Sequence, residues 1–248
     1  MKIIKLNSKD IESAINKIRR RQEKDLKNIE RKVDNILDIL VDQNSGSKRT
    51  VYICYSSEVI NGTSTSLLTG EIKGDELIKK KVLFRANNVS DSGVHFGCRL
   101  AILGNEIFMS IGDRGNRNQA QLLTTPNGKI HRLNDDGSIP EDNPFVNKPD
   151  AQKSIWTYGN RNPQGLVIDK KTSSIFSAEH GPRGGDELNV IEKGKNYGWP
   201  EITYGINYIG TKITKYTHKE GMEQPITHWT PSIAVSYTHL TLPTNREV

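Results

Sequence analysis

The chain has 248 residues, of which 34% are hydrophobic and 6% aromatic, enough for one large domain or two smaller ones with a lean core. No apolar run comes near the ~18 residues of a membrane span, and the charged start lacks the pattern of a signal peptide, so we expect neither feature. The net charge of +6 is concentrated in residues 1–49, with 13 Lys and Arg against 8 Asp and Glu, so we expect no nucleic-acid partner for the main body.

Residues 8–42 are predicted to be helical, because apolar residues recur there at the three-and-four spacing of an amphipathic helix. Residues 1–44 also loosely resemble the N-terminal helical region of histidinol dehydrogenases, without any catalytic motif. We therefore expect a helical segment that is foreign to the domain that follows and packs poorly against it.

The hydrophobic period changes from 3.6 to 2 after residues 43–47. Short β-rich runs follow, each bounded by turn residues, and Gly104-Asn105 joins two of them in hairpin style. Many short strands without helical patterns between them predict an all-β fold, either a sandwich, a barrel or a propeller. The expected strands are 51–55, 66–69, 81–85, 99–103, 107–111, 129–133, 165–168 and 174–177.

Two long connections, at residues 112–125 and 134–154, are candidates for binding loops on this scaffold. The two cysteines, Cys54 and Cys98, each lie in a strand-like apolar run. We predict buried free thiols there, in preference to a disulfide or a metal-binding pair.

A first pair of candidate functional residues is His95, between glycines at the head of a strand, and Asp113, at the end of the neighbouring strand. If these strands pair, Asp113 can reach a ring nitrogen of His95, fix its tautomer and make it a better general base. Spacing alone favours a structural histidine held in a loop over this interpretation.

Two further stretches carry possible chemistry. Arg161 and Asn162 lie in a polar turn, and an arginine fork suits carboxylate or quinone oxygens. The glycine-rich stretch 179–200 contains Gly181-Pro182, whose carbonyls suit a hard cation such as Ca²⁺, with Asp186 or Glu187 supplying negative charge. An ordinary surface loop is the alternative for this stretch.

The order of these motifs is more specific than any one of them. The blocks HFGCRL, GDRG, GKIHRLNDDGSIPEDNPF, IWTYGNRNPQG, EHGPRGGDELNVI and GKNYGWP resemble the soluble quinoprotein glucose/sorbosone dehydrogenases, in particular their aldose sugar dehydrogenase branch, over residues 48–236. This resemblance implies a six-bladed β-propeller that binds pyrroloquinoline quinone (PQQ) and Ca²⁺ and oxidises the anomeric carbon of aldoses to lactones. It also implies an external electron acceptor and a periplasmic or secreted location.

The resemblance further implies roles for individual residues. His95 matches the general base, Asp113 the carboxylate that orients it, and Arg161 with Asn162 the contacts to the quinone oxygens. Gln121 matches a side chain along the cofactor, and His180 and Asp186 match residues that flank the cofactor site. The carbonyls of Gly181 and Pro182 match ligands of the catalytic Ca²⁺. Glu187 and the Tyr197 backbone match ligands of a second, structural Ca²⁺.

Departures from the family pattern set limits on these expectations. The family continues with further blades, whereas the end of this chain, VSYTHLTLPTNREV, resembles translated sequencing adapter. We therefore expect a partial propeller, a non-native tail at residues 237–248, and impaired dehydrogenase activity. The alternatives are a calcium-dependent lactonase-type hydrolase, which favours several carboxylates around one metal, and a non-catalytic sugar-binding propeller.

Overall fold

The computed structural model describes residues 33–42 and 49–229. In these ranges it contains twelve β-strands and one 3-10 turn, η2 (Arg117–Gln121), arranged as three four-stranded antiparallel sheets. The all-β prediction is confirmed for this part of the chain. No helix in the described ranges is long and apolar enough to cross a membrane.

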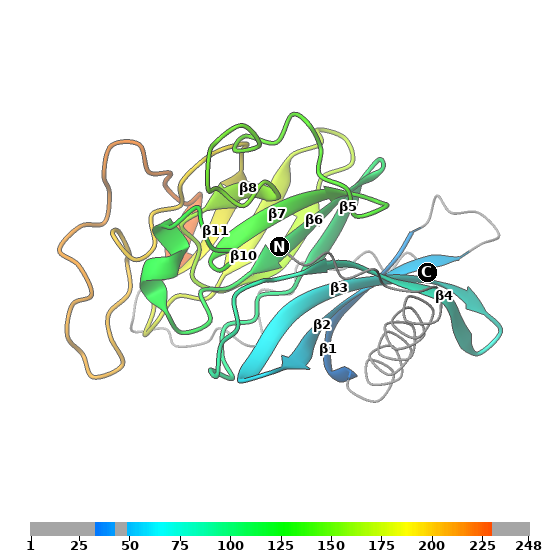
Figure 1. Ribbon diagram of the computed structural model, residues 1–248. Coiled ribbons are helices and arrows are strands. Elements are labelled where there is room, and N and C mark those ends of the chain that lie inside the picture. The colour runs from blue at the N-terminus through cyan, green and yellow to red at the C-terminus, as the bar shows by residue number, and fades with distance from the viewer. Residues whose placement is uncertain (1–32, 43–48, 230–248) are drawn as a thin grey trace, which may run out of the picture.

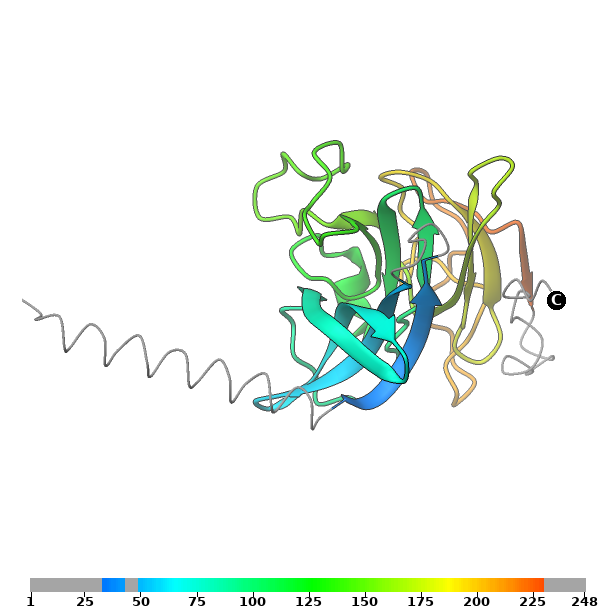
Figure 2. The ribbon, with the colours of Figure 1, turned by 90° about the vertical axis from the view of Figure 1, so that its right-hand side faces the viewer.

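Each sheet is made of four strands that follow one another in the chain. The first sheet contains β1 (Val33–Val41), β2 (Thr50–Val59), β3 (Gly62–Lys73) and β4 (Glu76–Arg85). The second contains β5 (Leu100–Leu103), β6 (Glu106–Ile111), β7 (Lys129–Asn134) and β8 (Ile155–Tyr158). The third contains β9 (Pro163–Ile168), β10 (Ile175–Glu179), β11 (Asp186–Ile191) and β12 (Thr227–Trp229). Figures 1 and 2 show the sheets following one another from blue through green to yellow.

The first strands of the three sheets lie beside each other, because β5 contacts both β1 and β9. Later strands of each sheet lie progressively further out, in the manner of propeller blades. Two apolar cores fill the spaces between the sheets. Strand β6 serves both, because its side chains alternate: Ile107, Met109 and Ile111 face the first sheet, and Phe108 faces the third.

The helix prediction for residues 8–42 is wrong over residues 33–41, which form β1 and pair with β2; the remainder of that segment lies outside the described residues. The physical reason is a β-bulge. The register passes from Ile36 to Asp38 while the partner strand advances by one residue, so the alternation of faces is interrupted at Leu37. Leu37 and Leu40 consequently both pack on the core, at a spacing that mimics a helix. Asp38 also accepts a hydrogen bond from the Leu100 amide (2.9 Å), which ties β1 to the second sheet.

The prediction of free thiols is also wrong. Cys54 and Cys98 form a disulfide, with their Cα atoms 5.7 Å apart, and both residues are fully buried. The two cysteines are 44 positions apart in the sequence and come close only because the first two sheets pack together, so the sequence alone does not predict their pairing. The disulfide joins β2 to the segment that leads into β5.

All eight predicted strands lie within or across observed strands, and Gly104-Asn105 forms the turn between β5 and β6. The predictions missed β8, β11 and β12, in addition to β1. Apart from the bulged β1, the missed strands are only three to six residues long. In addition, β8 and β11 lie inside polar, glycine-rich motifs, in which the hydrophobic period of 2 is not visible.

Candidate active site

His95 and Asp113 are hydrogen-bonded, as the sequence predicted: His95 Nδ1 lies 2.6 Å from Asp113 Oδ1. His95 has a positive φ of 53° and lies in the segment that enters β5, while Asp113 follows directly after β6. A Cβ at Gly112 would overlap the His95 carbonyl oxygen, so glycine is required there for the two segments to approach. The imidazole is 19% exposed and the carboxylate 2%, so the pair has one accessible and one buried member.

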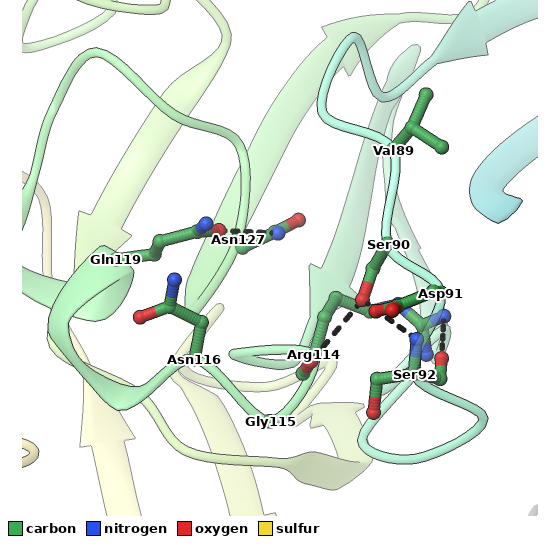
Figure 3. A pocket seen from close by; sticks show the side chains of 9 residues that line it. All are labelled: Val89, Ser90, Asp91, Ser92, Arg114, Gly115, Asn116, Gln119 and Asn127. Carbon is green, nitrogen blue, oxygen red and sulfur yellow. Dashed lines mark hydrogen bonds between the residues drawn. The ribbon is translucent and has the colours of Figure 1, made fainter. Parts of the chain in front are cut away.

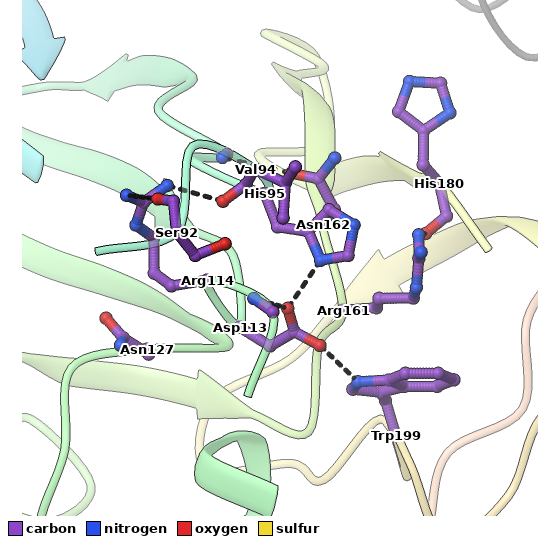
Figure 4. A network of polar contacts seen from close by, with 12 residues as sticks. Ser92, Val94, His95, Asp113, Arg114, Asn127, Arg161, Asn162, His180 and Trp199 are labelled. Atoms are coloured by element: carbon purple, nitrogen blue, oxygen red, sulfur yellow. Dashed lines mark hydrogen bonds and ion pairs between the residues drawn. The ribbon is translucent and has the colours of Figure 1, made fainter. Parts of the chain in front are cut away.

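The buried Asp113 carboxylate binds three donors (Figure 4). Its Oδ1 also accepts from the Gly115 amide (2.8 Å), and its Oδ2 accepts from Trp199 Nε1 (2.8 Å). The Asp113 amide donates to the Arg161 carbonyl at 2.7 Å. Asp113 therefore fixes the histidine relative to Trp199 through its carboxylate, and relative to the turn that carries Arg161 through its backbone amide.

Arg114 holds the segment before His95 in place. Its guanidinium donates to the carbonyls of Val94 (2.5 Å) and Ser92 (2.6 Å) and lies 3.4 Å from the centre of the Phe96 ring. Burial lowers the pKa of Arg114 to about 10, and the neighbouring Asp113 opposes that change. The cation still carries its charge at neutral pH, so these charge-assisted bonds persist.

Arg161 and Asn162 are buried next to this pair, in the turn between β8 and β9. Arg161 Nη1 donates to the carbonyls of His180 (2.9 Å) and Gly181 (2.6 Å), and its guanidinium lies 5.5 Å from the Trp199 ring centre. Asn162 Oδ1 accepts from the Gly97 amide at 3.1 Å, which directs its amide nitrogen away from that contact. The structure thus brings together His95, Asp113, Arg161 and Asn162, from three separate segments, as Figure 4 shows.

The residues predicted for the cofactor periphery have defined partners. His180 Nε2 lies 2.9 Å from Gln164 Oε1, and its Nδ1 lies 3.7 Å from Asp186 Oδ2. Asp186 Oδ1 accepts from the Gly181 amide at 2.8 Å. These bonds fix the turn at Gly181 and Pro182, whose backbone is too close to residues 184–185 to accommodate a Cβ at position 181.

The side-chain amide of Gln121 is hydrogen-bonded to other groups of the protein. Its Nε2 donates to Asn196 Oδ1 (3.0 Å) and to the Trp199 carbonyl (2.7 Å), and its Oε1 accepts from Asn196 Nδ2 (2.9 Å). Its amide therefore supports the backbone of Trp199, the residue that binds Asp113.

Glu179 and Glu187 occupy facing positions on β10 and β11. Glu179 accepts from Asn160 Nδ2 (2.8 Å), and burial raises its pKa to about 7. Burial raises the pKa of Glu187 to about 8, and the charge of Glu179 adds to this increase. The buried oxygens Asn160 Oδ1 and Asn189 Oδ1 accept no hydrogen bond from the described residues. Tyr197 is buried, with its hydroxyl donating to the Val190 carbonyl at 2.5 Å.

The sequence reasoning missed Trp199, Arg114 and Glu179 as parts of the site. Trp199 lies 86 positions from Asp113, and only its place in the GKNYGWP block points to it. In the described ranges, no cluster of three or more His, Cys, Asp or Glu side chains is arranged to hold a metal.

The three four-stranded antiparallel sheets are arranged in the manner of propeller blades, and a carboxylate–histidine pair lies at a strand end with an arginine and a tryptophan beside it. The family model for glucose/sorbosone dehydrogenases matches residues 11–241, and the chain belongs to this family. It is 39% identical over 207 residues to the aldose sugar dehydrogenase YliI of Escherichia coli, covering 81% of this chain and 56% of the relative. It is 40% identical over 213 residues to an uncharacterized protein of Synechocystis, covering 81% of this chain and 52% of the relative.

Solved structures give the same assignment. The apo-form crystal structure of the soluble aldose sugar dehydrogenase of Escherichia coli matches with a TM-score of 0.76 and 37% identity, over 79% of this chain and 58% of that chain. The PQQ-bound aldose sugar dehydrogenase of Streptomyces coelicolor matches with a TM-score of 0.62 and 28% identity, over 79% of this chain and 54% of that chain. The chain thus spans little more than half the length of these relatives.

Proposed function

We propose that the protein contributes to the oxidation of an aldose at its anomeric carbon, giving a lactone, with PQQ as hydride acceptor and an external electron acceptor to regenerate it. The observation that carries this proposal is the His95–Asp113 hydrogen bond beside Arg161. Family membership supports it, as do two relatives, a quinoprotein glucose dehydrogenase of Acinetobacter calcoaceticus and the PQQ-bound aldose sugar dehydrogenase of Streptomyces coelicolor.

His95 is proposed as the general base. With Nδ1 donating to Asp113, the neutral tautomer leaves Nε2 unprotonated and able to accept the proton of the sugar hydroxyl. Asp113 would stabilise the imidazolium that forms, and its bond to Trp199 prevents it from turning away. The partial exposure of the His95 ring gives a substrate access to it.

The residues around this pair fit a planar, anionic quinone in part. Arg161 is a cation held rigidly by two carbonyls and lies over the Trp199 ring, and Asn162 has its amide nitrogen directed away from its backbone contact. Bound there, PQQ would supply an electrophilic carbon that accepts hydride. The role we propose for Gln121 is to position Trp199, since its amide is already bonded to Asn196 and to the Trp199 carbonyl.

Calcium fits less well. The Gly181 carbonyl, a proposed ligand together with Pro182, accepts a hydrogen bond from Arg161, and a cation at that carbonyl would have to displace the guanidinium. For a second site we propose Glu187 and the Tyr197 carbonyl. The support is that Glu187 faces another carboxylate, Glu179, and that an uncoordinated Asn189 oxygen lies two residues away on the same strand.

The test is a titration of the purified chain with PQQ, with and without Ca²⁺, followed by ultraviolet–visible absorbance and by glucose oxidation with an artificial electron acceptor. The same assays are run on a version extended with the remaining blades of a relative. In whichever form turns over, His95→Ala should lower kcat by ~10²–10⁴. The matched control is His218→Ala, an exposed histidine outside the site.

Full turnover by the His95→Ala variant would remove His95 from the mechanism. Two other classes make different predictions. A lactonase-type hydrolase would open lactones without PQQ, and a non-catalytic sugar-binding propeller would bind sugar and give neither reaction.

A further inference from the structure

A cavity of about 280 Å³ lies between the segment before His95 and the turn after Asp113 (Figure 3). Asp91 and Ser92 line one side of it, and Gly115, Asn116 and Asn127 line the other. Its volume is close to the lower limit of small-molecule sites, which is enough for one ring-sized ligand.

One wall of this cavity is a rigid, buried amide. Asn127 is 1% exposed, and its Nδ2 donates to Gln119 Oε1 at 2.6 Å. The same Gln119 oxygen accepts from Asn88 Nδ2 at 2.7 Å. With its nitrogen committed, Asn127 directs Oδ1 away from Gln119 and into the cavity, as Figure 3 shows. Among the described residues, that oxygen accepts no hydrogen bond, so it is a preorganised acceptor facing open space.

The charges and hydrogen bonds of the walls disfavour an anionic ligand. Arg114 is the cation at the cavity, and its terminal nitrogens donate to the carbonyls of Val94 and Ser92 and to Thr63 Oγ1 (2.7 Å). Both N–H groups of Nη2 and one of Nη1 are therefore in use, so a phosphate or carboxylate cannot bind the guanidinium in a bidentate manner through Nη2. Asp91, an exposed carboxylate among the lining residues, repels anions further.

The same walls are too polar for an apolar ligand. Amides, serine hydroxyls and one carboxylate alternate around the space, and Val89 is the one aliphatic side chain among the lining residues. Such a set of mixed donors and acceptors matches a neutral ligand with many hydroxyl groups.

We infer that this cavity binds a sugar ring, as a subsite for the non-reacting ring of an oligosaccharide whose reducing end lies at His95. The subsite adjoins the pair directly, since the Gly115 amide in its wall bonds the same Asp113 oxygen as His95. The link to His95 rests on the proposed function, whereas sugar binding in the cavity does not.

The test follows the ¹⁵N-labelled full chain by two-dimensional NMR during a titration with maltose, without PQQ or Ca²⁺. We expect saturable shifts of the Gly115 and Asn116 amides and of the Asn127 side-chain amide. An Asp91→Ala/Asn116→Ala double variant should weaken maltose binding by about tenfold or more, the effect of losing two hydrogen bonds. Asn118→Ala, in the same turn but outside the cavity, is the matched control.

The absence of saturable shifts at these residues, or equal affinity in the double variant, would overturn the inference. Displacement of maltose by inorganic phosphate at equal concentration would do the same, because it would reveal an anion site. The replaced side chains are exposed, so an unchanged spectrum elsewhere verifies the fold of the variants. Sugar binding without any later turnover would contradict only the proposed function, and turnover without these shifts would contradict only the subsite.

Discussion

Asp113 shows how much depends on one buried carboxylate. It accepts from His95, Gly115 and Trp199, three groups on different segments, and it is buried. Its oxygens therefore replace the water that these donors would otherwise bind, and a side chain with fewer acceptor positions leaves a donor unpaired inside the protein.

Asp113→Asn should accordingly destabilise the chain by about 1–3 kcal/mol, because an amide nitrogen cannot accept from the donors it faces. The measurement is the free energy of unfolding in urea. Asp91→Asn, at an exposed position near the same turn, is the control and should change little. Equal stability of Asp113→Asn and the unmodified chain would contradict the three-donor arrangement.

His131 is a second buried residue with a measurable consequence. The ring is fully buried, with Nδ1 2.9 Å from Ser154 Oγ and Nε2 2.8 Å from the Pro126 carbonyl. A neutral ring satisfies both contacts. Burial lowers the pKa of His131 to about 4, and the charge of Lys129 contributes to this decrease, whereas the bond to Pro126 opposes it.

This shift predicts acid sensitivity. Between pH 6.5 and 4 the unfolded chain binds a proton at His131 and the folded chain does not, so the free energy of unfolding falls as the pH falls, by up to roughly 3 kcal/mol. Urea unfolding at several pH values should show a smaller fall for His131→Gln than for the unmodified chain. The exposed His218→Gln variant should keep the full pH dependence, and parallel curves for all three would refute the assignment.

At the residue scale, the sequence was sufficient to predict the His95–Asp113 contact, because both residues lie next to paired strands β5 and β6. It could not predict the contact of Asp113 with Trp199, which depends on loop paths that no periodicity encodes. Nor could it predict the disulfide, which depends on how two sheets pack.

At the scale of single elements, Lys129 determines the position of a turn. This fully buried lysine at the start of β7 donates to the carbonyls of Gln119 (2.9 Å), Ala120 (3.0 Å) and Asn127 (2.7 Å). Burial lowers its pKa to about 7. Through these bonds the ammonium group fixes η2, the turn that carries Gln121.

Lys129→Met should loosen η2, because three carbonyls lose a charged donor. Amide hydrogen exchange in residues 117–121 should accelerate by about tenfold or more, the equivalent of one charge-assisted hydrogen bond. Lys193→Met, which removes a half-exposed ion pair with Asp142, is the control. Unchanged exchange in η2 would show that packing alone holds the turn.

The presence of most strands could be predicted from the sequence more reliably than the residues at which they begin and end. Strands β2 and β6, for example, contain runs rich in β-branched, aromatic and aliphatic residues, which the sequence displays directly. In β1 the bulge at Leu37 interrupts the alternation of side chains between the two faces and produces an apparent helical spacing. A bulge is set by how the partner strand pairs, and this information is absent from a single segment.

At the scale of the whole molecule, the Cys54–Cys98 disulfide links the first sheet to the second across a separation of 44 residues. Closing a loop of that length stabilises a folded chain by about 4 kcal/mol, through the restriction of its unfolded state. The described fold should therefore be considerably less stable when reduced.

Unfolding in urea with and without a thiol reductant measures this contribution. We expect reduction to lower the urea concentration at the midpoint of unfolding. The Cys54→Ala/Cys98→Ala variant should have a midpoint similar to that of the reduced chain, and the reductant should not change it. The single Cys54→Ala variant separates the loss of the bond from the loss of buried volume. Identical midpoints under oxidising and reducing conditions would show that the bond does not contribute.

The two-faced strand β6 has a consequence for synthesis of the chain. Each sheet is assembled from consecutive strands, so it can form locally as it leaves the ribosome. Phe108 and Ile130, however, pack against Ile175 and Ile191 of the third sheet, which is translated later. Until the third sheet has been synthesised, the apolar face of the second sheet that contains Phe108 and Ile130 is exposed to solvent. The nascent chain should be most dependent on chaperones during this interval.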